Sequence, residues 1–163
     1  MTPTRVAMVR HSTLLLVALA ACYPATTRPD MVPVPGADQV EIDLMVPEAT
    51  RALAVALDGD SIPVSRTEPD DGWLETPWFD IATMRPTRHR AVGLGVVKVR
   101  AFVDPGRPDH SVLHVETVYR PLLDPSEPER NLERQVPTGH PVAARVKAVL
   151  DSLAKEYGDT AIP

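Results

Sequence analysis

The chain has 163 residues, of which 44% are hydrophobic and 24% charged, as is ordinary for a single globular domain. Its formal net charge is −5, and this acidic balance argues against nucleic acid as a partner, because nucleic acid binds basic surfaces. The single cysteine, Cys22, excludes an internal disulfide, a thiolate zinc site and a dithiol redox centre.

Residues 1–21 have the layout of a secretion signal. Residues 1–12 carry positive charge and no acidic residue, and residues 13–21 form an apolar run that ends in small residues. Such a run of about nine residues is too short to span a bilayer, which needs roughly 20. Translation from Met8 in place of Met1 would shorten the signal and leave its cleavage site unchanged.

The sequence Leu19-Ala20-Ala21-Cys22 resembles the lipobox of bacterial lipoproteins. The resemblance implies cleavage before Cys22 and attachment of a diacylglyceryl group to its thiol, and several acyl chains anchor a protein firmly. Tyr23 stands where an aspartate would retain an enterobacterial lipoprotein in the inner membrane, so we expect the outer membrane, with the domain facing the periplasm. The other interpretation is an ordinary cleaved signal followed by a chance cysteine.

The sequence predicts a tether over residues 22–38 and a single folded domain over residues 39–158. Residues 23–38 contain four prolines and little apolar periodicity, which favours an extended segment. We therefore expect this segment to be disordered and dispensable for folding.

The folded domain begins with alternating apolar and polar residues, which predict a strand, and then shows helical spacing after Pro47. Farther on, Trp73 to Ile81 has a strand pattern in which Pro77 indicates an edge or a bulge. The predicted elements of this half are a strand over 39–45, a helix over 47–58, a short strand at 62–64, a polar turn over 66–72 and a strand over 73–81.

The second half contains the strongest strand pattern, a long hairpin of residues 91–104 and 111–120. A basic loop over 85–90 precedes it, and an irregular connection over 121–138, with one helical turn at most, follows it. Residues 141–157 form an amphipathic helix between Pro141 and Gly158. The order β-α-β-β-β-β-α predicts an α+β domain: one antiparallel sheet with both helices on one face.

Two motifs have structural interpretations that compete with functional ones. Gly93-x-Gly95 is a fragment of a nucleotide-binding pattern, but no helix follows it, so a bend in the strand is the preferred interpretation. His110 and His114 lie about 13 Å apart along a strand, too far to share one metal ion. His114 and Glu116 share a strand face that His89 could approach, but solvated polar residues are the default there.

The acidic residues Asp70, Asp71, Glu75 and Asp80 lie close together in sequence. Paired carboxylates can perform acid–base chemistry, but acidic residues that flank a strand are much commoner. No Gly-x-Ser-x-Gly elbow is present, so the sequence predicts no catalytic residue, no metal and no cofactor.

Trp73, Trp78 and Phe79 are three of only seven aromatic residues. Alternation places Trp73 and Phe79 on one face of their strand and Trp78 on the other, unless a bulge at Pro77 shifts the register. One face belongs to the core, and a ring exposed on the other would mark a surface for a partner or ligand.

The segment GWLETPWF follows a helix and a short strand and precedes a long hairpin. In this arrangement residues 39–104 resemble the repeated domains of BamC-type outer-membrane assembly lipoproteins. The resemblance implies a fold of helices on an antiparallel sheet and a non-catalytic role in the envelope, and it assigns no residue a role.

These observations predict a lipid-anchored, non-enzymatic envelope protein whose periplasm-facing domain binds another envelope component. The alternative is a periplasmic lipoprotein that binds a small ligand between sheet and helices. An enzyme is disfavoured because none of the constellations has the required parts. An exposed apolar groove would favour a protein partner, and a concave pocket with a few convergent polar groups would favour a ligand.

Overall fold

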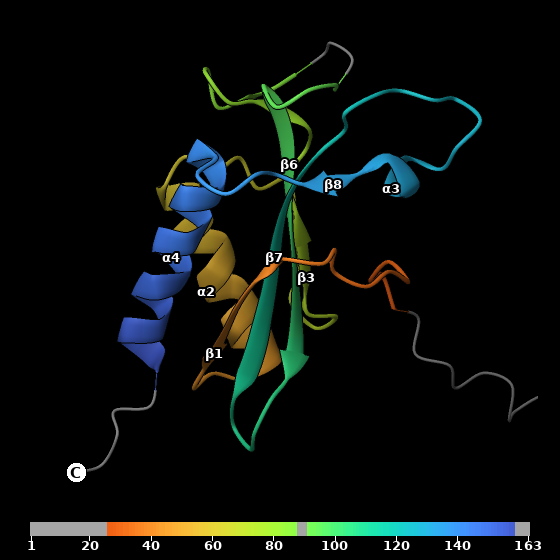
Figure 1. Cartoon of the computed structure of the whole chain (residues 1–163). Helices are drawn as coiled ribbons and strands as arrows, with labels where there is room; N and C mark the ends of the chain where they lie inside the picture. The colour runs from red at the N-terminus through yellow and green to blue at the C-terminus, as the bar shows by residue number, and fades with distance from the viewer. Residues whose placement is uncertain (1–25, 88–90, 159–163) are drawn as a thin grey trace, which may run out of the picture.

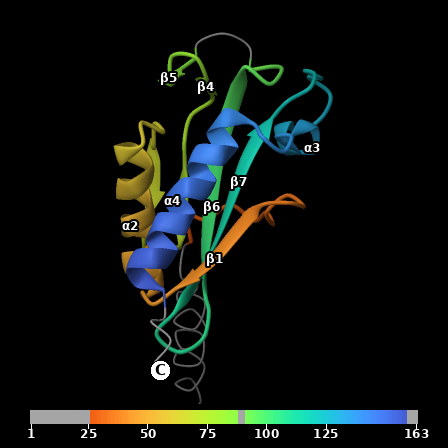
Figure 2. The same cartoon turned by 60° about the vertical axis from the view of Figure 1, so that its left-hand side comes forward.

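The computed structural model describes residues 26–87 and 91–158, which form an α+β domain on one open antiparallel sheet. Helices α2 (Val46–Gly59) and α4 (Pro141–Tyr157) lie side by side against one face of this sheet (Figures 1 and 2). The one-turn helix α3 (Glu129–Leu132) lies on the opposite side, which we call the outer face (Figure 1). The predicted fold class is therefore confirmed.

The sheet has the order β1-β7-β6-β3-β2, and β6 and β7 form the long central hairpin. Strands β4, β5 and β8 are attached to this path: β4 pairs with β6, β5 with β4, and β8 with β7. The strands are β1 (Asp38–Ile42), β2 (Arg66–Glu68), β3 (Trp73–Glu75), β4 (Phe79–Asp80), β5 (Arg85–Pro86), β6 (Val96–Pro105), β7 (Ser111–Tyr119) and β8 (Arg134–Gln135).

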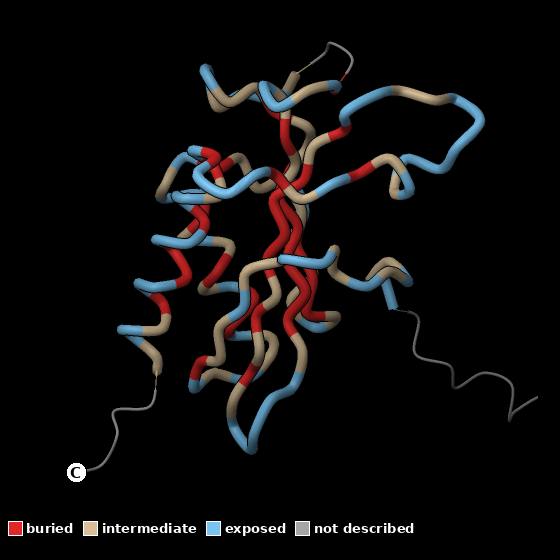
Figure 3. Tube along the Cα trace, viewed as in Figure 1, coloured by how far each residue is buried: buried red, intermediate tan, exposed pale blue. Residues whose placement is uncertain are grey.

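The apolar core lies between the sheet and the two long helices, and burial is concentrated on the central strands and on the facing sides of the helices (Figure 3). The predicted stripe of α4 is buried in this core, as the sequence pattern indicates, but α4 packs chiefly against β1 and α2 and only partly against β7 of the hairpin, because α2 covers β6. Buried members include Val142, Val146, Val149, Leu150 and Leu153 of α4, and Val97, Val99, Ala101, Val103, Leu113 and Val115 of the hairpin.

Several element predictions were wrong in detail. Residues 62–64 are not a strand, because Ile62 is buried directly after α2 and the pairing begins at Arg66, inside the predicted polar turn. Strand β6 begins at Val96, not at residue 91, because Gly93 turns the chain with φ +79°. The predicted basic loop contains the short strand β5.

The turn before β3 depends on a glycine. Gly72 has φ +62°, and a Cβ atom placed on it would lie 2.1 Å from the carbonyl oxygen of Val103. A residue with a side chain therefore could not bring this turn so close to β6. The Val103 amide donates a 2.8 Å hydrogen bond to the Gly72 carbonyl, which holds the turn in place.

A bulge between β3 and β4 reverses the faces of their side chains. Glu75 pairs with Arg100, and Phe79 pairs with Val97. The chain therefore advances four residues from Glu75 to Phe79 while β6 advances only three. The extra residue shifts the alternation, as Pro77 suggested. Trp73 therefore lies on the outer face and Phe79 in the helix-side core, whereas uninterrupted alternation would place them together.

The described part of the predicted tether, residues 26–38, packs on the domain. Arg28 forms an ion pair of 2.7 Å with Asp104 and lies over the ring of Phe102. The Val34 amide donates a 2.8 Å hydrogen bond to Glu116 Oε2, and Asp38 already belongs to β1. The expectation of a disordered segment is therefore wrong for these residues. Polar contacts hold them on the domain, and a lack of apolar periodicity does not reveal contacts of that kind.

Candidate functional site

The edge of the sheet beside β7 is formed by two separate strands. Strand β1 pairs with Ser111 to Val115, and β8 pairs with Val118 and Tyr119 on the same side of β7, since β6 occupies the other side. Between them the Val136 amide donates a 3.0 Å hydrogen bond to the Thr117 carbonyl. We call this break, where the start of β1 meets the end of β8, the split edge.

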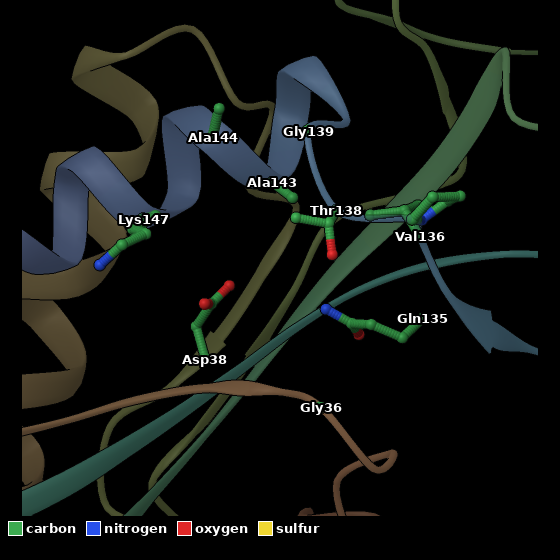
Figure 4. A pocket seen from close by; sticks show the side chains of 10 residues that line it. Gly36, Asp38, Gln135, Val136, Thr138, Gly139, Ala143, Ala144 and Lys147 are labelled. Carbon is green, nitrogen blue, oxygen red and sulfur yellow. The ribbon is translucent and has the colours of Figure 1, made fainter.

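A pocket of about 390 Å³ opens at the split edge toward α4, and we call it the helix-side pocket (Figure 4). Its walls come from the start of β1, the end of β8, the turn before α4 and the first turns of that helix. The lining residues are Gly36, Asp38, Gln135, Val136, Pro137, Thr138, Gly139, Ala143, Ala144 and Lys147. A volume of this size is within the range of small-molecule sites.

Three polar side chains from different elements line this pocket. The Asp38 carboxylate on β1 points toward α4, whereas the Lys147 side chain on α4 points away from it and donates a 3.1 Å hydrogen bond to Asp151 (Figure 4). Burial raises the pKa of Asp38, the charge of Lys147 opposes the shift and the charge of Asp151 adds to it. The Gln135 side chain directs its amide nitrogen toward the pocket, while its Oε1 atom is buried and has no hydrogen-bond partner among the described residues (Figure 4).

A second cavity, of about 470 Å³, which we call the outer cavity, lies at the split edge on the side of α3. Its lining is Val34, Pro35, Arg130, Asn131, Glu133, Arg134 and Gln135. Gln135 borders both cavities.

The outer cavity is bordered by a buried charge network formed by Arg100, Glu116, Arg130 and Glu133. Arg100 Nη1 donates to Glu116 Oε1 at 2.8 Å and to Glu133 Oε2 at 2.7 Å. Arg130 Nη2 donates to Glu116 Oε2 at 3.0 Å, and Arg130 Nη1 to Glu133 Oε2 at 3.1 Å. Burial alone would raise the pKa of Glu133, but hydrogen bonds from Arg100 and Arg130 outweigh it and lower the pKa. Both carboxylates are fully engaged by arginines, so this network is structural.

The three aromatic candidates are separated in the structure. Trp73 is 1% exposed and stacks on Phe102 with ring centroids 6.2 Å apart, and Phe79 is buried in the core. Trp78 is half-buried between Lys98 and Arg120, whose charged groups lie 5.5 and 4.6 Å from its ring centroid. Burial therefore removes Trp73 and Phe79 as candidates for a partner or ligand surface, and Trp78 is the member that keeps partial exposure.

The four acidic residues considered for acid–base chemistry do not form a pair. Asp71 accepts hydrogen bonds from Thr27, and Asp80 accepts them from Ala82 and Thr83 within its own turn. These hydrogen bonds lower the pKa of both carboxyls. Glu75 lies 3.4 Å from Lys98 Nζ, and Asp70 is exposed. Each carboxylate thus has separate surroundings.

The residues considered for a metal site, His89, His114 and Glu116, are not shown to come together in the structure. Glu116 is engaged by two arginines, His114 pairs in register with Phe102 and Gln39, and His89 lies outside the described residues. Within residues 26–87 and 91–158, no group of three or more His, Cys, Asp or Glu side chains could hold a metal ion. No helix in that part of the chain is long and apolar enough to cross a membrane. Cys22 and the predicted signal lie outside the described residues.

The sequence interpretation missed the helix-side pocket. It placed Asp38 in the tether and Gln135 in the irregular connection. One signal was available, since Asp38 is in phase with Val40 and Ile42 and so shares their strand face. The contact between the start of β1 and the end of β8 has no local sequence signal, because β1 ends at Ile42 and β8 begins only at Arg134.

No protein-family model matches the chain, and no curated protein matches its sequence. The resemblance of residues 39–104 to BamC-type domains therefore stays a prediction, and functional inference depends on the residues themselves.

Proposed function

We propose that this chain is a lipid-anchored, non-enzymatic protein of the cell envelope whose periplasm-facing domain binds another envelope component at the split edge. The lipobox-like sequence that ends at Cys22 supports the anchor. The observation that carries the binding site is the split edge itself, where two cavities flank Gln135 and bring together groups from both ends of the folded domain.

A binding role fits the chemistry of the described residues better than catalysis. The carboxylates and histidines singled out in the sequence lie in separate contacts, and a catalytic site needs a nucleophile or base in reach of a second positioned group. In contrast, a concave pocket with a few convergent polar groups is the usual form of a binding site.

The second candidate function is that of a periplasmic lipoprotein that binds a small ligand. The helix-side pocket favours it, since the cavity of about 390 Å³ is lined by the Asp38 carboxylate, which has no partner among the described residues, and by the Gln135 amide. The two candidates share the anchor and the location, with the outer membrane as the proposed site, and differ in the size of the bound component.

The anchor is tested at Cys22. We expect the mature protein extracted from membranes to carry acyl mass on Cys22 at its new N-terminus, measured by intact-mass spectrometry. The Cys22→Ser chain should lose both the acyl mass and its membrane association. If that variant is cleaved at the same bond and stays equally membrane-bound, the lipoprotein assignment is wrong.

The binding site is tested by photo-crosslinking in intact cells. A benzoylphenylalanine is placed at Ala144, on the helix-side pocket, or at Arg134, on the outer cavity. The control position is Val55, which is 74% exposed on α2 and lies in neither cavity. A discrete protein adduct from the split edge and none from Val55 supports the first candidate, and a small mass added to the labelled peptide supports the second. Equal adducts at all three positions, or none at the split edge, would contradict the proposed site.

A further inference from the structure

Asp38 is an unpaired carboxylate within the helix-side pocket. Its backbone pairs with Val115 at the start of β1, and its side chain points into the space beneath α4 (Figure 4). Among the described residues no hydrogen bond or ion pair reaches this carboxylate, and the Lys147 ammonium group donates its 3.1 Å hydrogen bond to Asp151. A partly buried carboxylate without a partner costs stability, and a cationic ligand would remove that cost.

Gln135 supplies a second polar group without a partner. Its Oε1 atom is buried and makes no hydrogen bond to the described residues. Native proteins satisfy most buried polar atoms, so such an atom calls for an explanation. Rotation of the side-chain amide exchanges its oxygen and nitrogen positions, which allows Gln135 to present an acceptor to a molecule in the pocket.

The size, lining and charge of the pocket restrict the class of ligand that it can bind. The apolar side chains of Val136, Ala143 and Ala144 form part of its lining, and the Thr138 hydroxyl adds a third possible acceptor. The charged groups around it are Asp38, Asp151 and Lys147, so the local balance is negative. A primary ammonium group has three N–H donors, which matches the three acceptors of Asp38, Gln135 and Thr138.

We propose that the helix-side pocket binds a small molecule through a primary ammonium group, with Asp38 as its counter-ion and Gln135 and Thr138 as hydrogen-bond acceptors. This inference rests on the small-ligand form of the proposed function and names its ligand class. The ammonium group of a free amine, of a peptide N-terminus or of an aminolipid headgroup has the required chemistry.

The test compares three probes of nearly equal size on the purified full chain. Ethanolamine carries the ammonium group, ethylene glycol is its neutral analogue and glycolate its anionic one. Binding is followed by the backbone amide NMR shifts of Gly36 and Gly139, which line the pocket from two sides. We expect saturable shifts with ethanolamine, and none with the other two at a tenfold higher concentration. Equal shifts with ethylene glycol, or stronger shifts with glycolate, would overturn the proposal.

Variants assign the binding to Asp38. Because Asn has the shape of Asp and the carboxylate has no partner to lose, we expect Asp38→Asn to fold and to bind ethanolamine at least about tenfold more weakly, as loss of a charged hydrogen bond implies. Gln135→Ala should weaken binding by a smaller factor. The matched control is Asp70→Asn, the same change at an exposed residue of the β2–β3 turn, which should leave binding unchanged. Undiminished binding by Asp38→Asn would overturn the inference.

Two further probes separate the sources of the ammonium group. Glycinamide represents a peptide N-terminus, and glycerophosphoethanolamine represents an aminolipid headgroup. Tighter binding of one of them than of ethanolamine supports the inference and identifies that source. If none of the amines binds but crosslinking from Ala144 or Arg134 still yields a protein adduct, this inference fails and the proposed function stands.

Discussion

Arg100 and Glu116 lie directly opposite each other on β6 and β7, and their side chains meet on the outer face, with Arg100 Nη1 2.8 Å from Glu116 Oε1. The Arg100 side chain is 6% exposed and the Glu116 side chain is fully buried. Burial of such charges is costly unless each is paired. The pair is completed by Glu133 and Arg130 from the chain segment around α3, so it also fixes that segment, and with it β8, to the sheet.

The first prediction concerns the loss of Arg100. We expect Arg100→Ala to lower the free energy of unfolding by about 3–5 kcal/mol, because it leaves buried carboxylates without their main counter-ion. Urea unfolding measures the change. Arg51→Ala is the control: Arg51 is exposed on α2 and its nearest ion pair is 3.8 Å long, so a change below about 0.5 kcal/mol is expected. A cost for Arg100→Ala as small as that of the control would show that the network contributes little.

The second prediction is a pH dependence that originates at Glu133. Its pKa in the folded state is lowered from the ordinary value of 4.5, so its stabilising contribution is present above that value and is lost as the pH falls through the folded-state pKa. Glu133→Gln should therefore be less stable than the parent chain at pH 7, and the difference should shrink at pH 3. Urea unfolding at both pH values checks this.

The matched control for Glu133→Gln is Glu48→Gln, at an exposed position of α2. This change should alter the free energy of unfolding by less than about 0.5 kcal/mol at either pH. A parent–variant difference for Glu133 that is the same at pH 3 and pH 7 would mean that the ionised carboxylate is not the source of the stability.

The sequence predicted those parts of the fold that depend on local periodicity. The stripe of α4 and the alternation of β6 and β7 identified the two surfaces that form the core, since a residue's position in a helix or strand determines its face. The bulge at Pro77 was recognised as a possibility, but its effect on Trp73 and Phe79 depends on pairing with β6, which local sequence does not specify.

The candidate site could not be predicted because it depends on contacts between distant segments. Alternation along each strand places the Arg100 and Glu116 side chains on the face of the sheet away from the core residues Val99, Ala101 and Val115. Only the register between β6 and β7 brings the two charges together. Likewise, the helix-side pocket exists because β8 ends where β1 begins. A proline-rich segment next to a predicted signal was read as a tether, and nothing in its composition revealed the contacts of Arg28 and Val34.

The third prediction tests how α4 closes the core. Leu150 is 3% exposed and belongs to the core cluster, so Leu150→Ala should cost about 2–5 kcal/mol of unfolding free energy. Thermal or urea unfolding measures this. Lys155→Ala, at an exposed position of the same helix, should change the value by less than about 0.5 kcal/mol. Equal effects would mean that α4 is an arm free to offer its apolar stripe to a partner.

The last prediction concerns the N-terminal segment on the outer face. A chain that begins at Ala37 lacks the Arg28–Asp104 ion pair and the hydrogen bond from the Val34 amide to Glu116. Loss of a hydrogen bond to a buried charged group costs about 1.5–3 kcal/mol, so this chain should melt several degrees below one that begins at Thr26, which keeps these contacts. Arg130 also donates to the Val32 carbonyl, so truncation should loosen the segment around α3, measured as faster amide hydrogen exchange at Asn131 and Glu133. Identical melting midpoints for the two chains would restore the interpretation of residues 26–36 as a tether, and the buried charge network would then have to hold its geometry without them.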